Sequence, residues 1–281
     1  QSEDRPENIK VCVWTGVYFQ INLSIKGTTM EIENQAQDVT FSQGDIDGLY
    51  KTIFNRRDVR SQFKPDPIPD DVLARILQAA HHAPSVGFMQ PWNFLLIKSP
   101  DVKQEIHDAF TEANEEAAKM FEQQKQQTYR SLKLEGILEA PINLCITCDR
   151  SKAGPVVLGR THIKTMDLYS SVCAVQNLWL AARAEGVGVG WMSIIKEEAF
   201  HSILGIPEEV VPIAYLCMGY VSHFNKKPEL ETAKWRERLP LSQQVFFDQW
   251  QQTKTGEQEG LIAELDLNAD FPQKFTNLYP G

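Results

Sequence analysis

Apolar residues recur at helical spacing in three long stretches of the chain. The first begins at Pro69-Asp70 and ends at Ala83-Pro84, with its apolar positions on one helical face. The second begins at Pro100-Asp101 and continues its apolar face to Met120. The third, residues 166–185, is apolar nearly all round, which predicts a helix buried inside the domain or at a dimer interface.

Short apolar runs between these stretches predict strands. They cover residues 92–97, 142–147, 187–193 and 211–220. Two shorter helical patterns cover residues 47–56 and 196–204. The alternation predicts a mixed α/β or α+β domain with four or five strands.

The charge of the chain is unevenly distributed. The 281 residues carry a formal net charge of −9 and have an average composition, which is typical of a soluble globular protein. Residues 30–50 contain five acidic and no basic residues, and residues 251–281 contain five acidic and two basic ones. Residues 51–250 are close to neutral, with 24 acidic and 23 basic residues. Duplex nucleic acid is therefore disfavoured as a partner, whereas a small anion is not.

The N-terminal residues differ from the rest of the chain. Apolar residues 11–25 are interrupted by Gln20 and Asn22 and are too few to span a membrane. Acidic residues precede them where a signal peptide carries positive charge, and Met30 opens a segment typical of a protein start. We therefore expect residues 1–29 to be a non-native or upstream extension and residues 30–47 an acidic N-terminal arm. The functional domain is predicted at 48–250, followed by a C-terminal tail at 251–281.

The five cysteines do not form a disulfide framework, because their number is odd and they are widely spread. This indicates a reducing, cytoplasmic location. Cys145 and Cys148 have the spacing of a metal or redox pair, but no second pair completes four ligands. Their apolar surroundings favour a buried strand, so we predict no metal site. Because residues 11–25 are too few to span a membrane, we also expect no membrane partner.

Three glycines, Gly186, Gly188 and Gly190, resemble a dinucleotide-binding motif only in spacing. They follow a predicted helix and open a predicted strand, whereas the Rossmann motif runs from strand to glycines to helix. We expect them to serve the helix exit and strand packing.

Candidate chemistry lies in three separated segments. Residues 56–60, Arg-Arg-Asp-Val-Arg, place three guanidinium groups close together; they fit either phosphate capture or a solvated helix end. Residues 83–92, Ala-Pro-Ser-Val-Gly-Phe-Met-Gln-Pro-Trp, form a turn whose backbone can approach a planar ligand. Arg236 and Arg238 form a late basic pair.

Together these segments resemble the nitroreductase superfamily of FMN proteins over about residues 48–240. Further strings, including Gly159-Arg-Thr-His and Gly190-Trp-Met-Ser, resemble one family within it, the 5,6-dimethylbenzimidazole synthases. The resemblance implies an α+β fold with a mixed central sheet flanked by helices. It also implies a homodimer that binds FMN between its subunits, and it makes residues 48–250 a flavin domain.

The resemblance also implies the site residues. Asp58 and Ser193 are the expected catalytic residues, the first as general base and the second positioning O2 by a hydrogen bond. Asp58 replaces the Ser or Thr common in nitroreductases, and without the resemblance an ion pair with Arg57 or Arg60 explains it equally well. The expected flavin contacts are Arg56, Arg57, Asp58, Val59, Arg60, Ser85, Met89, Gln90, Ser193, Arg236 and Arg238. Residues 154–162 and 110–132 are expected to cover the site, although Arg160 and His162 fit a surface role equally well.

The implied reaction is the oxygen-dependent fragmentation of reduced FMN to 5,6-dimethylbenzimidazole, the lower ligand of cobalamin, with release of erythrose 4-phosphate. Because no nicotinamide site is readable, NAD(P)H is expected to act only through a separate FMN reductase. The alternative is a general NAD(P)H-dependent nitro or quinone reductase, and a third reading is a non-catalytic flavin carrier.

Overall fold

The computed structural model describes residues 8–13, 17–22, 32–34, 40–252 and 259–272. Two compact units divide the chain, residues 1–46 and 47–281. In the first unit, strands β1 (Asn8–Val13), β2 (Val17–Asn22) and β3 (Ile32–Asn34) form an antiparallel sheet in that order. The expected upstream extension and acidic arm fall partly outside the described residues, and their boundaries stay predictions.

The second unit is built on a four-stranded sheet. Its strands are β4 (Trp92–Ile97), β5 (Ile142–Asp149), β6 (Val187–Met192) and β7 (Val210–Tyr220), in the order β4-β5-β7-β6. All three strand pairs are antiparallel. The expectation of a mixed sheet is wrong for these four strands, and the parallel pairing of Asp58 with Val189 of β6 is an isolated bridge. The α+β class is confirmed.

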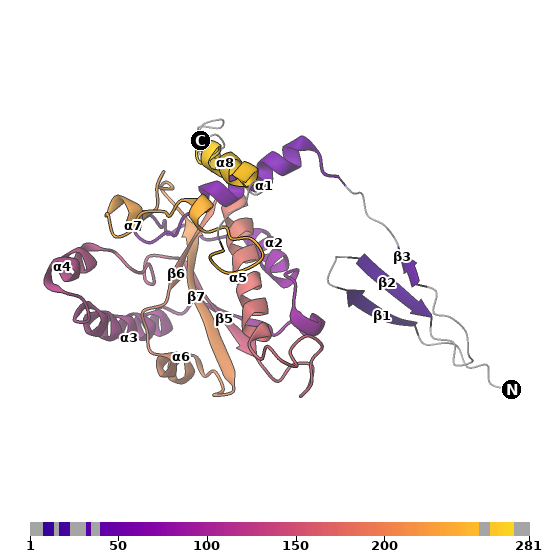
Figure 1. Cartoon of the computed structure of the whole chain (residues 1–281). Helices are drawn as coiled ribbons and strands as arrows, with labels where there is room; N and C mark the ends of the chain where they lie inside the picture. Colours follow the sequence, from indigo (N-terminus) through magenta and orange to yellow (C-terminus); the bar gives the residue numbers. More distant parts are fainter. Residues whose placement is uncertain (1–7, 14–16, 23–31, 35–39, 253–258, 273–281) are drawn as a thin grey trace. The chain divides into compact units, whose positions relative to one another are not determined.

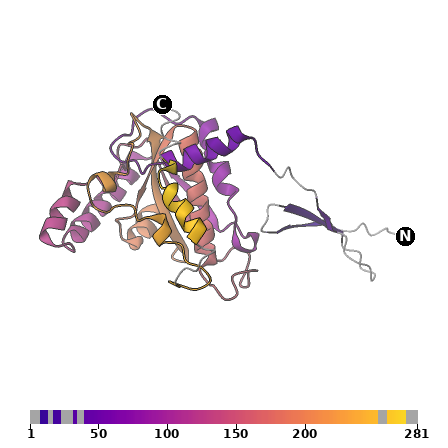
Figure 2. The same ribbon diagram turned by 45° about the horizontal axis from the view of Figure 1, so that its top comes forward.

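Helices cover both faces of this sheet (Figure 1). Helices α2 (Asp70–His81) and α5 (Met166–Ala184) pack on one face, where Leu144 and Ile146 of β5 join their apolar cluster. Helices α3 (Pro100–Ala118) and α6 (Glu197–Leu204) pack on the other, around Cys145. Figure 2 shows α3 and α4 on the opposite side of the sheet from α5.

The alternation of β5 explains its two cysteines. Successive side chains of a strand point to opposite faces, so Cys145 and Cys148, three residues apart, lie on opposite faces and cannot share a metal ion. Burial raises the pKa of the Cys145 thiol to about 12. Both cysteines are buried in the core, as the sequence predicted.

The remaining elements are α1 (Gln43–Asn55), α4 (Gln123–Ser131), α7 (Glu229–Thr232) and α8 (Glu259–Leu267), with short turns of 3-10 helix at Val86–Phe88 and Leu241–Gln243. The expected helical cover at 110–132 is divided between the end of α3 and α4. Beyond α8, the ring of Phe271 packs edge-on against Tyr50 and Phe54 of α1.

The segment that follows α1 lies against β6 at very short range. The Val59 N–H donates to the Val189 carbonyl at 3.1 Å, and Val59 is buried. A Cβ on Gly190 would lie 2.0 Å from the Val59 carbonyl oxygen, a distance that no side chain tolerates. Gly186 has a φ of +77° at the helix exit. Helix exit and strand packing therefore explain these glycines, as expected.

Replacing Gly190 with alanine tests this close approach. Because the clash is with backbone, Gly190→Ala is expected to lower the free energy of unfolding by about 3 kcal/mol, at the upper end of overpacking costs. Gly48→Ala is the control, since nothing lies within 4 Å of a Cβ there, and this helical position gains about 0.5–1 kcal/mol from alanine. Urea unfolding measures both. Equal effects of the two changes would contradict the packing role.

Candidate active site

Asp58 is held at the edge of β6 by two contacts. Its Oδ1 accepts the backbone N–H of Trp191 at 2.9 Å, and its Oδ2 forms an ion pair with Arg60. The side chain remains 33 % exposed. The carboxylate is thus fixed in direction while one side stays open to a bound molecule.

Burial raises the pKa of Asp58, although Arg60, the Trp191 N–H and Arg56 all lower it. From the sequence, the neighbouring arginines alone favour the ionised form. The structure shows that desolvation outweighs them, because the carboxyl is enclosed by the 56–60 segment and β6. A raised pKa makes this carboxylate a stronger base near neutral pH.

Arg60 is committed to protein partners. Its guanidinium pairs with Asp58 and lies 3.8 Å from Glu229 of α7. The Gln62 amide donates to the same glutamate at 2.9 Å. Arg60 therefore orients Asp58, which bears out the ion-pair reading without excluding the catalytic one.

Arg56, Arg57 and Arg238 come together as a cluster of positive charge. Burial lowers the pKa of Arg56, and the charge of Arg238 lowers it further. Burial also lowers the pKa of Arg57, as do Arg56, Arg238 and Arg183. Like charges crowded in this way are relieved by an anion.

The donors of this cluster fit a phosphate. Within the described residues, Arg57 Nε is buried and has no hydrogen-bond acceptor. Its Nη atoms donate to the carbonyls of Phe54 and Lys226, which fixes the plane of the guanidinium. Arg56 lies 4.6 Å over the ring of Trp179, so it too is fixed. A pre-oriented, undercompensated set of guanidiniums is the donor set that a phosphate group requires.

Ser193 follows β6 two residues after Trp191, and its side chain is exposed. Two residues of extended chain span about 7 Å. Because Asp58 binds the backbone of Trp191, the structure brings both expected catalytic residues to one strand end.

The turn at residues 85–90 is strained. Gly87, Phe88 and Gln90 have φ values of +54°, +52° and +47°, which are unusual for the two residues with side chains. Strain of this kind persists where surrounding contacts enforce it, and it concentrates at functional sites.

Contacts inside the turn enforce its shape. The buried Ser85 hydroxyl accepts the Gln90 N–H at 3.1 Å. Lys152 Nζ donates to the Trp92 carbonyl and the Asn93 side chain, each at 2.8 Å. Met89 is buried in an apolar cluster with Val86 and Val157, so its side chain supports the turn. Of the expected contacts here, the half-buried Gln90 is the more available.

The structure does not bring this turn and the arginine cluster together within one chain. Val86 of the turn donates to Ser170, near the start of α5, whereas Arg56 lies on Trp179 and the Asn55 carbonyl binds Arg183, near the end of that helix. From Ser170 to Trp179 the helix rises about 14 Å. The turn also adjoins β4 and Asp58 adjoins β6, the two opposite edges of the sheet.

Of the late basic pair, Arg238 lies near the arginine cluster. Arg238 is close enough to Arg56 and Arg57 to affect both pKa values. Arg236 is exposed.

Comparison of the chain with known proteins identifies its family. A model of the "Nitroreductase family" matches residues 53–220. The chain belongs to the nitroreductase family. It is 39% identical to 5,6-dimethylbenzimidazole synthase of Rhodospirillum rubrum, over 72% of this chain and 94% of that protein. It is 35% identical to the enzyme of the same name from Rhodobacter capsulatus, over 72% and 97%.

Solved structures share the nitroreductase fold. Iodotyrosine deiodinase, bound to FMN and 3-iodo-L-tyrosine, aligns with a TM-score of 0.57 and 21% identity, covering 72% of this chain and all of that one. A BluB-like flavoprotein from Clostridium difficile 630 aligns with a TM-score of 0.54 and 22% identity, covering 72% and 99%.

Several residues of this candidate site could not be predicted from the sequence. Arg183 and Trp179 support the arginine cluster from α5, more than 100 residues along the chain. Trp191 contributes a backbone N–H, which leaves no trace in its side-chain identity. Lys152 follows the Asp-Arg pair at the end of β5, but only the fold shows that it reaches the turn.

The arginine cluster predicts anion-dependent stability. A ligand that binds only the folded state stabilises it by mass action, so the protein is expected to melt about 3 °C higher in phosphate than in chloride at equal ionic strength. Arg238→Gln should abolish most of this difference. Arg236→Gln, on the same exposed segment, should keep it. Thermal melts of the three proteins measure the effect, and equal phosphate shifts in all of them would contradict the assignment of Arg238.

Proposed function

We propose that this protein catalyses the oxygen-dependent fragmentation of reduced FMN to 5,6-dimethylbenzimidazole, with release of erythrose 4-phosphate. The observation that carries the proposal is the half-buried, hydrogen-bonded Asp58 beside a cluster of arginines. The similarity to two 5,6-dimethylbenzimidazole synthases over nearly their full length supports it.

FMN fits the donor set. Arg56, Arg57 and Arg238 would hold its phosphate. The Arg57 Nε without an acceptor and the crowded positive charge support this assignment. Gln90 and the backbone of the strained turn would contact the ring. When bound, reduced FMN supplies both the electrons for O2 and the atoms of the product.

Asp58 and Ser193 have different roles in the proposed reaction. Asp58 Oδ2 accepts a proton from the substrate, since its raised pKa and fixed direction suit a general base. Arg60 keeps that carboxylate oriented. The exposed Ser193 hydroxyl would position O2 by donating a hydrogen bond to it.

The protein acts as a homodimer in this proposal, and the partner completes the site. The arginine cluster and the turn lie at opposite ends of α5, so one subunit's cluster meets the turn of the other. Exposed Tyr169 and Val172 on α5 favour an interface along this helix.

The reducing equivalents come from outside the protein. A separate FMN reductase, using NAD(P)H, supplies reduced flavin. A cytoplasmic setting belongs to this proposal, supported by the free thiols of the four described cysteines.

One assay tests the reaction. Purified protein given chemically reduced FMN and air is expected to form 5,6-dimethylbenzimidazole, detected by chromatography. Asp58→Asn keeps an oxygen acceptor for the Trp191 N–H but removes the base, and Ser193→Ala removes the hydroxyl. Both variants should bind FMN within a few-fold of wild type and lose product by at least about a hundredfold, the typical contribution of general acid–base catalysis.

Other outcomes reject the proposal. No product, together with rapid NADH-dependent nitro reduction, would identify a general nitro or quinone reductase. FMN binding with neither activity would identify a flavin carrier. Product at the wild-type rate from both variants would remove the roles given to Asp58 and Ser193.

Mixed dimers test the shared site. Asp58→Asn alters the cluster side and Gln90→Ala the turn side, and each homodimer is expected to lose at least tenfold in rate. If each site combines both subunits, re-associated mixtures restore about one quarter of the wild-type rate, because half of the dimers carry one intact site of two. Mixtures as inactive as either parent would show that each subunit builds its own site. A Gln90→Ala homodimer at full rate would exclude the turn.

A further inference from the structure

The segment between β5 and α5 is long and irregular, yet closely packed. Residues 150–165 contain no regular helix or strand, and connections of this length in a compact domain are usually functional. The tip exposes apolar side chains, with Val156 at 77% and Leu158 at 84%. Between them, Val157 is buried against Val86 and Met89 of the turn, so one apolar anchor holds the tip and polar contacts hold the rest of the loop.

This loop lies directly on the strained turn. A Cβ on Gly87 would lie 2.6 Å from Val157 Cγ1 and 2.9 Å from the Leu158 carbonyl. A Cβ on Gly159 would lie 2.9 Å from Val86. Glycines on both sides allow the two backbones to approach closely, so movement of the loop is transmitted to the turn.

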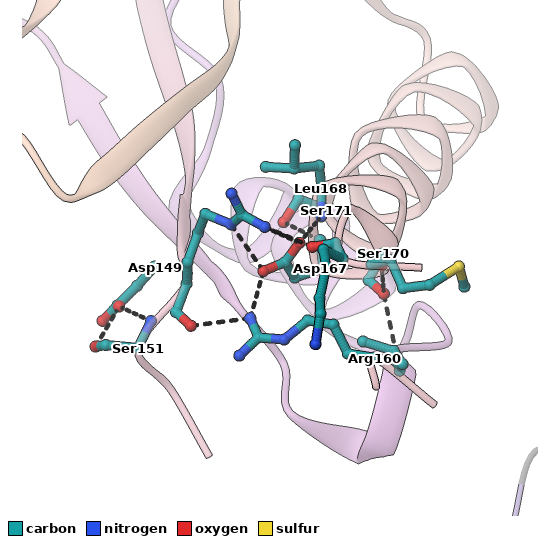
Figure 3. Close-up of polar contacts among 11 residues, drawn as sticks. Asp149, Ser151, Arg160, Asp167, Leu168, Ser170 and Ser171 are labelled. Atoms are coloured by element: carbon teal, nitrogen blue, oxygen red, sulfur yellow. Dashed lines mark hydrogen bonds and ion pairs between the residues drawn. The ribbon is translucent and has the colours of Figure 1, made fainter. Parts of the chain in front are cut away.

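A single buried carboxylate holds the loop. Asp167, in the first turn of α5, is fully buried and binds two arginines of the loop (Figure 3). Arg150 Nε donates to Oδ2 at 3.0 Å, and Arg160 Nη1 pairs with the same oxygen. The Leu168 N–H donates to Oδ1 at 2.9 Å. Arg160 also donates to the Arg150 carbonyl, and Arg150 to the Lys164 carbonyl, so the start, middle and end of the loop are tied to one group.

Asp167 stays ionised in this position. Burial raises its pKa, but hydrogen bonds from Arg150 and Arg160 more than compensate, leaving the pKa below its ordinary value. The Arg160 side chain is 11% exposed, which excludes the surface role left open by the sequence. Removing the Asp167 charge alone would leave two guanidiniums without their buried partner, and breaking a buried ion pair in this way is strongly destabilising.

We propose that Asp167 is a positioning residue that holds loop 150–165 over the turn at Ser85–Gln90, and thereby sets the turn in the shape that contacts flavin. The flavin contact rests on the proposed function, whereas the hold on the turn rests on geometry alone. Asp167 itself does not take part in the chemistry.

Hydrogen exchange and oxidised-FMN affinity test this role in the full-length protein. Asp167→Asn preserves the shape and an acceptor for Leu168 but loses the charge. It is expected to increase amide exchange in residues 150–165 and 85–90, and to weaken FMN binding about tenfold, since small displacements of a positioning element are costly. Asp149→Asn is the matched control, because the Asp149 carboxylate accepts hydrogen bonds from the backbone N–H and the hydroxyl of nearby Ser151, local contacts that do not involve Asp167 (Figure 3). The Asp149→Asn variant should bind FMN with an affinity within twofold of wild type.

Arg160→Gln is a second variant, needed if Asp167→Asn does not fold. It is expected to fold because Arg150 still pairs with Asp167 in that protein. Asp167 and Arg160 act as a unit, so the double variant should weaken FMN binding no more than the stronger single variant. Additive losses, or faster exchange in the loop with an unchanged turn and unchanged FMN affinity, would overturn the proposal. A protein that binds FMN but forms no 5,6-dimethylbenzimidazole would instead reject the proposed function and leave this result intact.

Discussion

The close approach of residues 58–59 to β6 is the constraint on which the site depends. With glycine at 190, the Val59 carbonyl reaches the strand backbone, and Asp58 comes within hydrogen-bonding distance of the Trp191 N–H. The same contact fixes where the preceding arginines lie and puts Asp58 near Ser193. The missing side chain at Gly190 of β6 thus determines the geometry of the Asp58 carboxylate.

Two electrostatic environments meet at this point. Burial and, to a smaller extent, the charge of Arg238 lower the pKa values of Arg56 and Arg57, and a bound anion would relieve this crowding of positive charge. Asp58, a few ångströms along the chain, has its own partner in Arg60 and a pKa raised by burial. Phosphate capture and proton transfer can therefore be served by adjacent residues of one short run, because only some of its arginines are paired with carboxylates.

The ring side of the site is built by different means. The turn with positive φ values at Phe88 and Gln90 is contacted by the Ser85 hydroxyl, by Lys152 at the Gln90 carbonyl and by the loop that Asp167 holds. Because this turn lies at the far end of α5 from the arginines, the flavin of the proposed function would contact two separate places on the fold, and their meeting requires a second subunit in the proposed dimer.

The sequence by itself determined the elements and the residue types of the site. Helical and strand periodicity located α2, α5 and all four strands of the second unit, because apolar spacing directly reflects the faces that a helix or strand buries. The run at 56–60 and the turn at 83–92 indicated the family. Tertiary structure alone decided that Arg60 is occupied, that burial reverses the expected shift of Asp58, and that Asp167 binds Arg160. These depend on desolvation and on contacts between distant segments, which local sequence patterns do not encode.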